Sequence, residues 1–268
     1  RKESSAASDV YKRQIFMGVS FLFHSLAIFI SVKIVTPLWQ CSDSLGLQVL
    51  TITLGYFVFL HLFPLLIGLT RFFVQPRLKA GECEIGLNKT YLSYVVNSLF
   101  YGVYISSPFC KQSSFLLYIR WAFYRLFGMK IPFSSIVSVE AMIRQPELIE
   151  VGEKSILGAG CIIICHYAPN SKTHIQNKVI IGDNSVIGGY AGIAPGLRLG
   201  NNSVIGAKCT TYPDVQIGDN VSIGSECSLY YAAKIPNNVK IKSHSFVDKH
   251  CDIKEGETWG GNPAVKIK

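Results

Sequence analysis

A six-residue periodicity in the second half of the chain constrains the fold more than any other feature. Between Val151 and Trp259, the residue at every sixth position is aliphatic, with Pro169, Thr211 and Trp259 as exceptions. The members of this column are Val151, Leu157, Ile163, Pro169, Ile175, Ile181, Ile187, Ile193, Leu199, Ile205, Thr211, Ile217, Ile223, Leu229, Ile235, Ile241, Val247, Ile253 and Trp259. A six-residue unit cannot bury its own apolar face, so the units must stack into a solenoid whose strands pair from coil to coil.

Glycine and small side chains occupy other fixed positions of the six-residue unit. Glycine often follows the aliphatic residue, and it tolerates the backbone of a tight corner. A small or short side chain lies four residues after the aliphatic one, at Ser155, Cys161, Ser185, Ala191, Ser203, Cys209, Val221, Cys227, Ser245 and Cys251. We expect the aliphatic and the small positions to point inward.

A second periodicity predicts the number of sides. Two hexads with glycine turns are followed by a divergent one, as in IGDNSV, IGGYAG, IAPGLR. Each coil is therefore expected to have three sides and about 18 residues, and about six coils at ~4.8 Å each would stand roughly 30 Å tall. The predicted fold class is an all-β left-handed parallel β-helix over residues 131–268, preceded by α-helical transmembrane and interfacial segments.

Two long apolar segments precede the repeats. Apolar residues make up 49% of the 268-residue chain, and its mean hydropathy is +0.30. Residues 15–32 and 49–74 are long enough to cross a bilayer, so residues 15–80 are expected to form two transmembrane helices and their connector. The exit from the second segment contains Arg71, Arg77 and Lys79. Positive charge favours the cytoplasmic side, which predicts an integral protein of the cytoplasmic membrane with its β-helix facing the cytosol.

Residues 81–130 do not resemble plain membrane spans. Residues 91–110 are uncharged and rich in tyrosine, whereas residues 113–130 alternate apolar side chains with Arg120 and Arg125. This composition is typical of interfacial or re-entrant helices. We expect both arginines to extend toward lipid phosphates, and the alternative is that they contact an anionic acceptor.

The first fourteen residues, RKESSAASDVYKRQ, resemble translated sequencing-adapter DNA and are left out of the fold prediction. They contain four basic and two acidic residues, so removing their charge of +2 changes the net charge from +9 to +7. The basic character survives this correction. The natural protein is then expected to extend upstream of the segment given.

The eight cysteines contain no CxxC pair and lack the density of a disulfide scaffold. Four of them, Cys161, Cys209, Cys227 and Cys251, occupy the small inward position of the hexad. Buried cysteine behaves as a small apolar residue. We therefore expect reduced thiols in a reducing compartment.

One segment interrupts the repeat. Residues 165–178, CHYAPNSKTHIQNK, lose the glycine turns and gain proline and polar residues, so residues 167–178 are expected to leave the solenoid as a loop. His166 lies three residues after Ile163, at a corner just before this loop. The same offset in later hexads of that side is occupied by Asn184, Asn202, Asn220 and Asn238. Asparagine accepts left-handed backbone angles, whereas a histidine there either serves structure alone or has a chemical role.

The repeat resembles that of the hexapeptide-repeat acyltransferases, whose unit is an aliphatic residue, a glycine, two variable residues, a small residue and one more. In that family a histidine beside an extruded loop acts as general base, and His166 matches it. Imidazole titrates near neutral pH and can accept the proton of an attacking hydroxyl or amine. The resemblance further implies a homotrimer, no bound cofactor, a CoA or phosphopantetheine thioester as cosubstrate, and acceptor binding by loop residues. The loop candidates are Tyr167, Asn170, Lys172 and His174.

The carboxyl end carries a second motif. Its WGGNPA is similar to the closing motif of acyl-CoA-dependent hexapeptide enzymes, which lies near their pantetheine channel. The residues expected to bind acyl-CoA are Trp259, Gly260, Gly261, Asn262, Pro263, Ala264 and Lys266. Lysines in this region supply charge suited to phosphates.

The membrane segments and the lead-in PELIEVGEKSILGAGCIIICHY also resemble the terminal membrane and β-helix domain of some nonribosomal peptide synthetases. The chain departs from that domain after His166, where APNSK stands in place of acidic residues. Two alternatives to a CoA-dependent acyltransferase therefore stay open. One is such a terminal domain with a carrier-bound donor, and the other is a non-catalytic membrane scaffold.

A metal centre is not expected. Some trimeric β-helices are zinc carbonic anhydrases with three histidines at subunit junctions, but His244 and His250 are six residues apart, which does not match that spacing. His166 has no paired ligand of the kind that zinc requires. Nucleic acid is likewise not an expected partner.

Overall fold

The computed structural model describes residues 2–41, 43–75 and 77–268. The chain forms two compact units, Arg1–Gln75 with Val96–Leu126, and Pro76–Val95 with Phe127–Lys268. Residues 2–14 of the segment interpreted as adapter-derived belong to the first helix, and the side chains of residues 1–12 lie outside the described residues.

Two long helices dominate the first unit. Helix α1 (Lys2–Gln40) packs along α2 (Leu45–Val74). Within the described residues, Arg13–Gln40 and Leu45–Val74 are the two stretches long and apolar enough to cross a membrane, with mean hydropathies of 2.1 and 2.0. Arg71, in the last turn of α2, is buried and donates a hydrogen bond to the carbonyl of Leu126 at 3.1 Å.

Three shorter helices occupy the region where interfacial helices are expected: α3 (Lys89–Ser106), α4 (Cys110–Phe115) and α5 (Leu117–Leu126). The prediction that Arg120 extends toward lipid phosphates is wrong, because its side chain is buried, with only 4% of the residue exposed. Arg125 instead lies over the ring of Trp121, 5.7 Å from its centroid.

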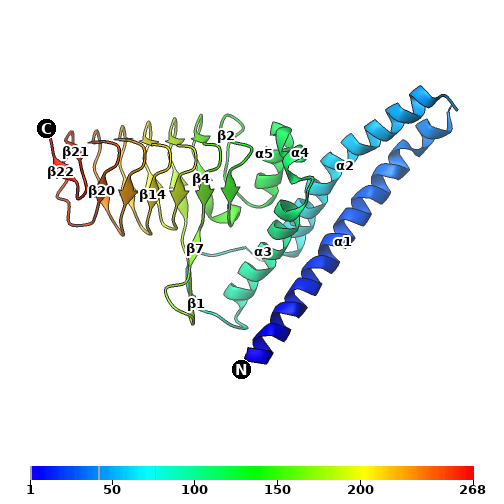
Figure 1. Ribbon diagram of the computed structural model, residues 1–268, viewed down its shortest axis with the longest axis horizontal. Coiled ribbons are helices and arrows are strands. Elements are labelled where there is room, and N and C mark those ends of the chain that lie inside the picture. Colours follow the sequence, from blue (N-terminus) through cyan, green and yellow to red (C-terminus); the bar gives the residue numbers. More distant parts are fainter. Residues whose placement is uncertain (1, 42, 76) are drawn as a thin grey trace. The chain divides into compact units, whose positions relative to one another are not determined.

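The second unit is a three-sided parallel β-helix, drawn from green to red in Figure 1. The first face consists of β2 (Ile136–Val137), β5 (Ile156–Leu157), β10 (Val186–Ile187), β13 (Val204–Ile205), β16 (Ser222–Ile223), β19 (Lys240–Ile241), β21 (Thr258–Gly260) and the antiparallel β22 (Val265–Lys266). The second face consists of β3 (Met142–Ile143), β6 (Ile162–Ile163), β11 (Gly192–Ile193), β14 (Thr210–Thr211), β17 (Ser228–Leu229) and β20 (Phe246–Val247). The third consists of β4 (Ile149–Val151), β9 (Val179–Ile181), β12 (Arg198–Leu199), β15 (Gln216–Ile217) and β18 (Lys234–Ile235).

This architecture confirms the predicted fold class. The first coil begins earlier than the sequence column, because Lys130 already pairs with Glu150 and Ile136 with Ile156. That coil contains the 3₁₀ turn η1 (Pro146–Leu148). The β-helix is consequently one coil longer than the roughly six predicted from ~4.8 Å stacking of the recognised hexads.

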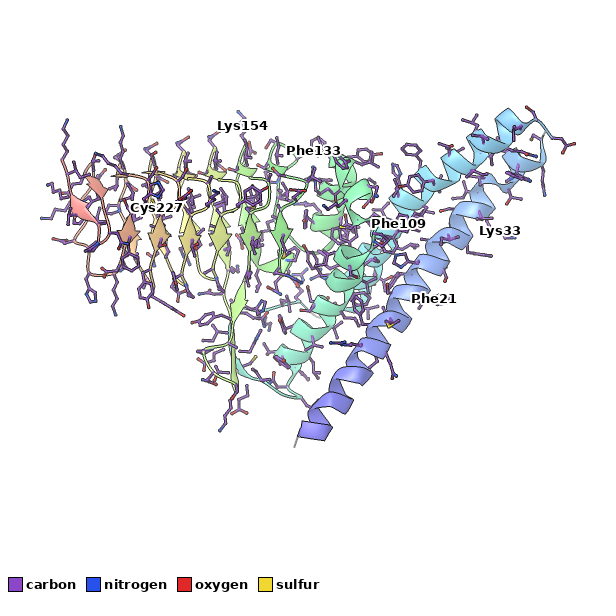
Figure 2. The ribbon with its side chains drawn as sticks, in the orientation of Figure 1. Phe21, Lys33, Phe109, Phe133, Lys154 and Cys227 are labelled. Atoms are coloured by element: carbon purple, nitrogen blue, oxygen red, sulfur yellow. The ribbon has the colours of Figure 1, made fainter. Side chains whose placement is uncertain are left out.

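The interior is built from the two positions predicted to point inward. The aliphatic side chains of Leu157, Ile187 and Ile205 are fully buried. The small residues stack beside them, and Cys227 lies inside the β-helix whereas Lys154 projects from an outer corner (Figure 2). The corner asparagines have the expected left-handed backbone, with φ angles of 52°, 52°, 57° and 62° at Asn184, Asn202, Asn220 and Asn238.

The register shows that the interrupting segment is an insertion of two hexads. Leu199 pairs with Ile217, which is three hexads further along the chain. Val151 instead pairs with Ile181, five hexads further along, so two hexads are inserted at this coil. Because the insertion is a whole number of hexads, the aliphatic column continues through it without a phase change. Within the insertion, Pro169 is exposed and Ile175 is only half-buried.

The prediction that His166 lies on the same side as the four corner asparagines is wrong because of this insertion. Ile163 pairs with Ile193 on the second face, whereas the hexads that precede the four corner asparagines lie on the third face. The residues at the same offset from Ile193 and its neighbours on the second face are Gly196, Asp214 and Ala232, all with positive φ. His166 therefore does not replace an asparagine of a regular corner.

The insertion forms a β-hairpin of β7 (His166–Tyr167) and β8 (Thr173–Gln176). A third strand, β1 (Gly81–Glu84), pairs with β8, so that Cys83 lies opposite His174. Figure 1 shows β7 leaving the stacked coils toward β1. The prediction of helices throughout residues 81–130 is wrong for residues 81–84, because β8 offers them an unpaired strand edge.

Candidate active site

His166 is the first residue of the hairpin, where the backbone turns out of the second face. Two hydrogen bonds fix its half-buried ring. Nδ1 lies 2.8 Å from Oε1 of Gln145, and Nε2 lies 3.0 Å from the hydroxyl of Tyr94. Both nitrogens of the imidazole are therefore engaged, one from the first coil and one from helix α3.

The surroundings of Gln145 select one tautomer of His166. Gln145 is buried in a left-handed conformation (φ 52°), and its Oε1 also lies 3.4 Å from the backbone nitrogen of Cys165. That N–H can only donate. The Gln145 oxygen is thus the acceptor in both contacts, so His166 carries its proton on Nδ1 and Nε2 accepts from the Tyr94 hydroxyl.

A second histidine and an aromatic cluster cover this side of the hairpin. His174 is 3% exposed and lies parallel to His166, with ring centroids 5.4 Å apart. Tyr94 packs on both rings, at 4.2 Å from His174 and 4.8 Å from His166. Tyr91 contacts the edge of His174 at 5.4 Å. The first turns of α3 thus close the site that the hairpin begins.

This side of the hairpin also contains buried polar atoms without partners. Nε2 of His174 and both polar atoms of the Gln176 amide have none among the described residues. Gln176 is 1% exposed and directly faces His166 across the hairpin. Leaving buried polar groups unpaired costs roughly 1–3 kcal/mol each. Among the described residues of the β-helix unit, the buried side-chain atoms without a partner lie in this hairpin.

Burial and two neighbouring titratable groups favour the neutral form of His166. Burial, followed by the charges of His174 and Arg144, lowers the pKa of His166 to about 4. Burial also lowers the pKa of His174. At neutral pH the His166 ring is therefore uncharged and able to accept a proton.

A groove of about 440 Å³ lies along the second face and includes His166 in its lining. His166 and Tyr167 form one end of it, and Gly192, Thr210 and Tyr212 lie along it. Gly192 contributes space, because a Cβ at this position would meet nothing within 4 Å. The groove is mostly apolar, and His166 is among the residues that line it.

The other loop residues proposed from the sequence are divided between two places. Tyr167 lies beside His166 in the groove, and His174 packs on His166 from the opposite side. Asn170 and Lys172 lie at the turn of the hairpin, both exposed. The Asn170 side chain accepts hydrogen bonds from the backbone nitrogens of Lys172 and Thr173, at 2.8 and 2.9 Å, and so holds the turn.

The WGGNPA motif closes the far end of the second face. Trp259 pairs with Ile241 on the first face, and the chain then turns so that Phe246 donates to the carbonyl of Gly261 and accepts from the nitrogen of Ala264, at 2.9 and 2.8 Å. Glu257 braces the motif by accepting from Lys266, Trp259 and the backbone of Lys254. These hydrogen bonds, that of Lys266 foremost, lower the pKa of Glu257 to about 2.

His166 and residues 261–264 of the motif therefore lie on the second face, whereas Trp259 and Gly260 belong to the first face. Four inter-strand steps, from β6 through β11, β14 and β17 to β20, separate their levels, or roughly 19 Å at ~4.8 Å a step. A row of aromatic rings lies between them: Tyr212 and Tyr230 are 4.7 Å apart, and Tyr230 and Phe246 are 5.8 Å apart.

Sequence reasoning missed Gln145 and Tyr94, the two residues that bind the His166 ring. Gln145 is in the irregular first coil, and Tyr94 is in a segment predicted to be an interfacial helix. A left-handed residue ahead of Pro146 has no distinct sequence signal, and a tyrosine among several others has none either. Only the pairing of β1 with β8 brings the start of α3 to the hairpin.

Comparison with known families identifies the repeat. Residues 178–213 and 196–230 match the family described as bacterial transferase hexapeptide (six repeats). The match lies within the regular coils and includes neither the hairpin nor the helices. With the three-sided coils, it shows that the chain carries an acyltransferase-like hexapeptide-repeat fold. A search of curated proteins found no match.

Several solved structures are similar to the β-helix. The acetyltransferase domain of PglB from Neisseria gonorrhoeae is 18% identical with a TM-score of 0.42, covering 56% of this chain and 64% of that domain. AntD, an N-acyltransferase from Bacillus cereus in complex with dTDP and 3-hydroxybutyryl-CoA, is 18% identical with a TM-score of 0.48, covering 57% and 88%. A maltose O-acetyltransferase from Clostridium difficile is 22% identical with a TM-score of 0.39, covering 56% and 74%. The chain thus spans less than two thirds of the Neisseria domain.

Proposed function

We propose that this protein is a membrane-anchored acyltransferase. It moves an acetyl or related acyl group from a CoA or phosphopantetheine thioester to a hydroxyl or amine. The observation that carries the proposal is the neutral, half-buried His166 at one end of a groove on the face that WGGNPA closes. The groove receives the thioester, and His166 is the general base.

The proposed reaction is a direct transfer. The acceptor hydroxyl or amine attacks the thioester carbonyl, and its proton passes to Nε2 of His166. The new C–O or C–N bond forms, the C–S bond breaks, and the imidazolium returns the proton to the departing thiolate. A positioned base of this kind contributes typically 10²–10⁴-fold to the rate. The low pKa of His166 keeps it in the accepting form across the neutral range.

The donor is proposed to lie along the second face. Its thioester reaches His166, its pantetheine arm follows Tyr212, Tyr230 and Phe246, and its phosphates lie near WGGNPA. The residues proposed for this end are Trp259, Gly260, Gly261, Asn262, Pro263, Ala264 and Lys266. Lys266 is exposed at its tip while bonded to Glu257, so it can contact an anionic group at the surface.

The acceptor is proposed to approach from the hairpin. Tyr167 and His174 are in contact with the groove or with His166 and are the stronger candidates for contacting it. Asn170 and Lys172, at the exposed turn, would meet only a large acceptor such as a lipid-linked saccharide or a peptidyl group. The helices α1 and α2 are proposed to anchor the chain in the cytoplasmic membrane with the β-helix in the cytosol, and a homotrimer is proposed from the family resemblance.

Calorimetry with the detergent-solubilised full chain tests the donor groove. We expect acetyl-CoA to bind, and Thr210→Phe to weaken binding at least about tenfold, equal to about 1.4 kcal/mol. Ser222→Phe is the matched control, because Ser222 has the same outward strand position on the first face. Equal loss in both variants would contradict the assigned groove.

Calorimetry, together with an assay of acyl transfer, separates the alternatives. No binding of acetyl-CoA, with transfer from a phosphopantetheine-loaded carrier protein, would select the carrier-bound donor. No binding of acetyl-CoA and no transfer from the carrier protein would favour a non-catalytic membrane scaffold.

A further inference from the structure

The imidazole of His166 does not present a vacant nitrogen to the groove. Nδ1 is bonded to Gln145 and Nε2 to the hydroxyl of Tyr94. Tyr94 is absent from the groove lining, whereas His166 is part of it. An acceptor that loses its proton to Nε2 must therefore either displace Tyr94 or act through it.

The packing of Tyr94 argues against displacement. Its ring contacts His166, His174 and Tyr91, with centroid distances of 4.8, 4.2 and 5.8 Å. It lies close to the start of α3, and the strand β1 just before this helix is paired with β8 of the hairpin. The residue is nevertheless only half-buried, and the alternative to displacement is that an acceptor contacts its hydroxyl.

We propose that Tyr94 relays the acceptor proton to His166, and that Gln145 is the positioning residue that keeps the Nε2 lone pair directed at Tyr94. This inference rests on the proposed acyl transfer. The acceptor gives its proton to the Tyr94 oxygen as Tyr94 gives its own to Nε2, and the acceptor oxygen or nitrogen bonds to the thioester carbon. The C–S bond then breaks, and the proton returns through Tyr94 to the thiolate. The tyrosine ends as it began.

The relay assigns a catalytic role to a segment outside the repeats. Residues 81–95, with β1 and the first turns of α3, supply Tyr94 and close the site beside the hairpin. The matched hexapeptide repeats, at 178–230, do not include them. We therefore expect acceptor choice to depend on this segment rather than on the regular coils.

The charge of residue 145 is expected to change the pKa of His166, and this change can be measured. The titratable groups that face the ring are His174 from β8, Arg144 beside Gln145, and Tyr94 from α3, while Tyr91 contacts His174 and Tyr94. Gln145 is neutral and does not stabilise the imidazolium. Gln145→Glu keeps the hydrogen bond and adds a negative charge next to Nδ1, which favours the protonated ring.

Nitrogen NMR of the detergent-solubilised full chain, with labelled histidine, tests the hydrogen-bond assignment without any substrate. We expect His166 to be protonated on Nδ1 in the wild type and in Tyr94→Phe, and Gln145→Leu to lose this preference. A wild-type ring protonated on Nε2 would overturn the relay. Comparison with His166→Asn identifies the signal.

Kinetics test the relay itself. Tyr94→Phe keeps the ring packing and is expected to lower kcat by about 10²-fold, the range of a lost proton-transfer group, with KM and thermal midpoint unchanged. Gln145→Glu is expected to retain activity and to move the acidic limb of the pH–rate profile upward. Tyr190→Phe, at an exposed corner, is the control and should leave kcat unchanged.

Two results would contradict the relay. An unchanged or higher kcat in Tyr94→Phe would show that Tyr94 only blocks Nε2, and an unmoved pH profile in Gln145→Glu would remove Gln145 from the site. A wild type with the Nδ1 tautomer but without transferase activity would instead overturn the proposed function and leave the hydrogen-bond assignment intact.

Discussion

The regular coils and the hairpin that interrupts them treat buried polar groups in opposite ways. In the coils, Ser203 Oγ donates to the carbonyl of Gly218 and accepts from the nitrogen of Val221, at 2.8 and 3.0 Å, and Ser185 repeats the pattern one coil earlier. In the hairpin, Nε2 of His174 and the amide of Gln176 are buried without a partner among the described residues. The serines of the coils therefore satisfy their own hydrogen bonds within the stack, whereas these hairpin side chains do not.

The glycines of the coils also differ in how tightly they are packed. Those at the corners, such as Gly206, allow neighbouring coils to approach closely, whereas Gly192, a coil residue that lines the same groove as His166, faces open space. A rigid stack thus holds one irregular element whose polar atoms are not satisfied by the chain itself. Strain and unpaired groups of this kind gather at functional sites.

The largest expected effect concerns two isoleucines of one sequence column. Ile205→Ala should destabilise the protein by about 2–5 kcal/mol, because a fully buried aliphatic side chain leaves a cavity. Ile175→Ala should cost much less, since Ile175 is half-buried in the hairpin. Thermal denaturation followed by circular dichroism checks both variants, and equal losses would contradict the separation of the hairpin from the stack.

A smaller effect is expected from adding one methyl group to a glycine. In Gly206→Ala the new Cβ would lie 2.5 Å from the carbonyl carbon of Gly224 in the next coil. Relieving that overlap should cost about 1–3 kcal/mol. Gly192→Ala has open space and should leave the denaturation midpoint almost unchanged. A larger loss in Gly192→Ala than in Gly206→Ala would disprove this account of coil packing.

The smallest expected changes in the free energy of unfolding should have opposite signs. Ser203→Ala removes a group with satisfied partners and should cost about 1–3 kcal/mol, because the Val221 nitrogen is left unpaired. Gln176→Leu replaces an amide that has no described partner and should be neutral or slightly stabilising. Urea denaturation measures the free energy of unfolding of both variants. A clear loss in Gln176→Leu would show that the amide has a partner in solution.

The repeat predicted the fold because each hexad repeats the same physical demand. An aliphatic side chain, a glycine corner and a small inward residue recur, and the structure places them as expected at Leu157, Ile187 and Ile205. The same regularity caused the error at His166. An insertion of two whole hexads leaves a six-residue pattern in phase. The sequence column therefore continues across the hairpin, and the hexads after it lie on a different face from the one that counting in threes assigns.

The candidate site was predictable only at His166 and its loop. Gln145 depends on a left-handed backbone in an irregular coil, and Tyr94 reaches the site through the pairing of β1 with β8. Pairing between distant segments leaves little trace in GECE, which shows no apolar alternation. Arg120 was misplaced for a related reason, since its burial depends on tertiary packing.

We place acyl transfer at the hairpin rather than at the regular coils, and substitution of one histidine in each region tests this placement directly. Thiol release from acetyl-CoA in the presence of acceptor-containing membrane extract should fall by about 10²–10⁴-fold in His166→Ala. It should be unchanged in His244→Ala, because His244 is an exposed residue at a regular corner with φ 58°. Unchanged turnover in His166→Ala, with both variants folded, would contradict the account.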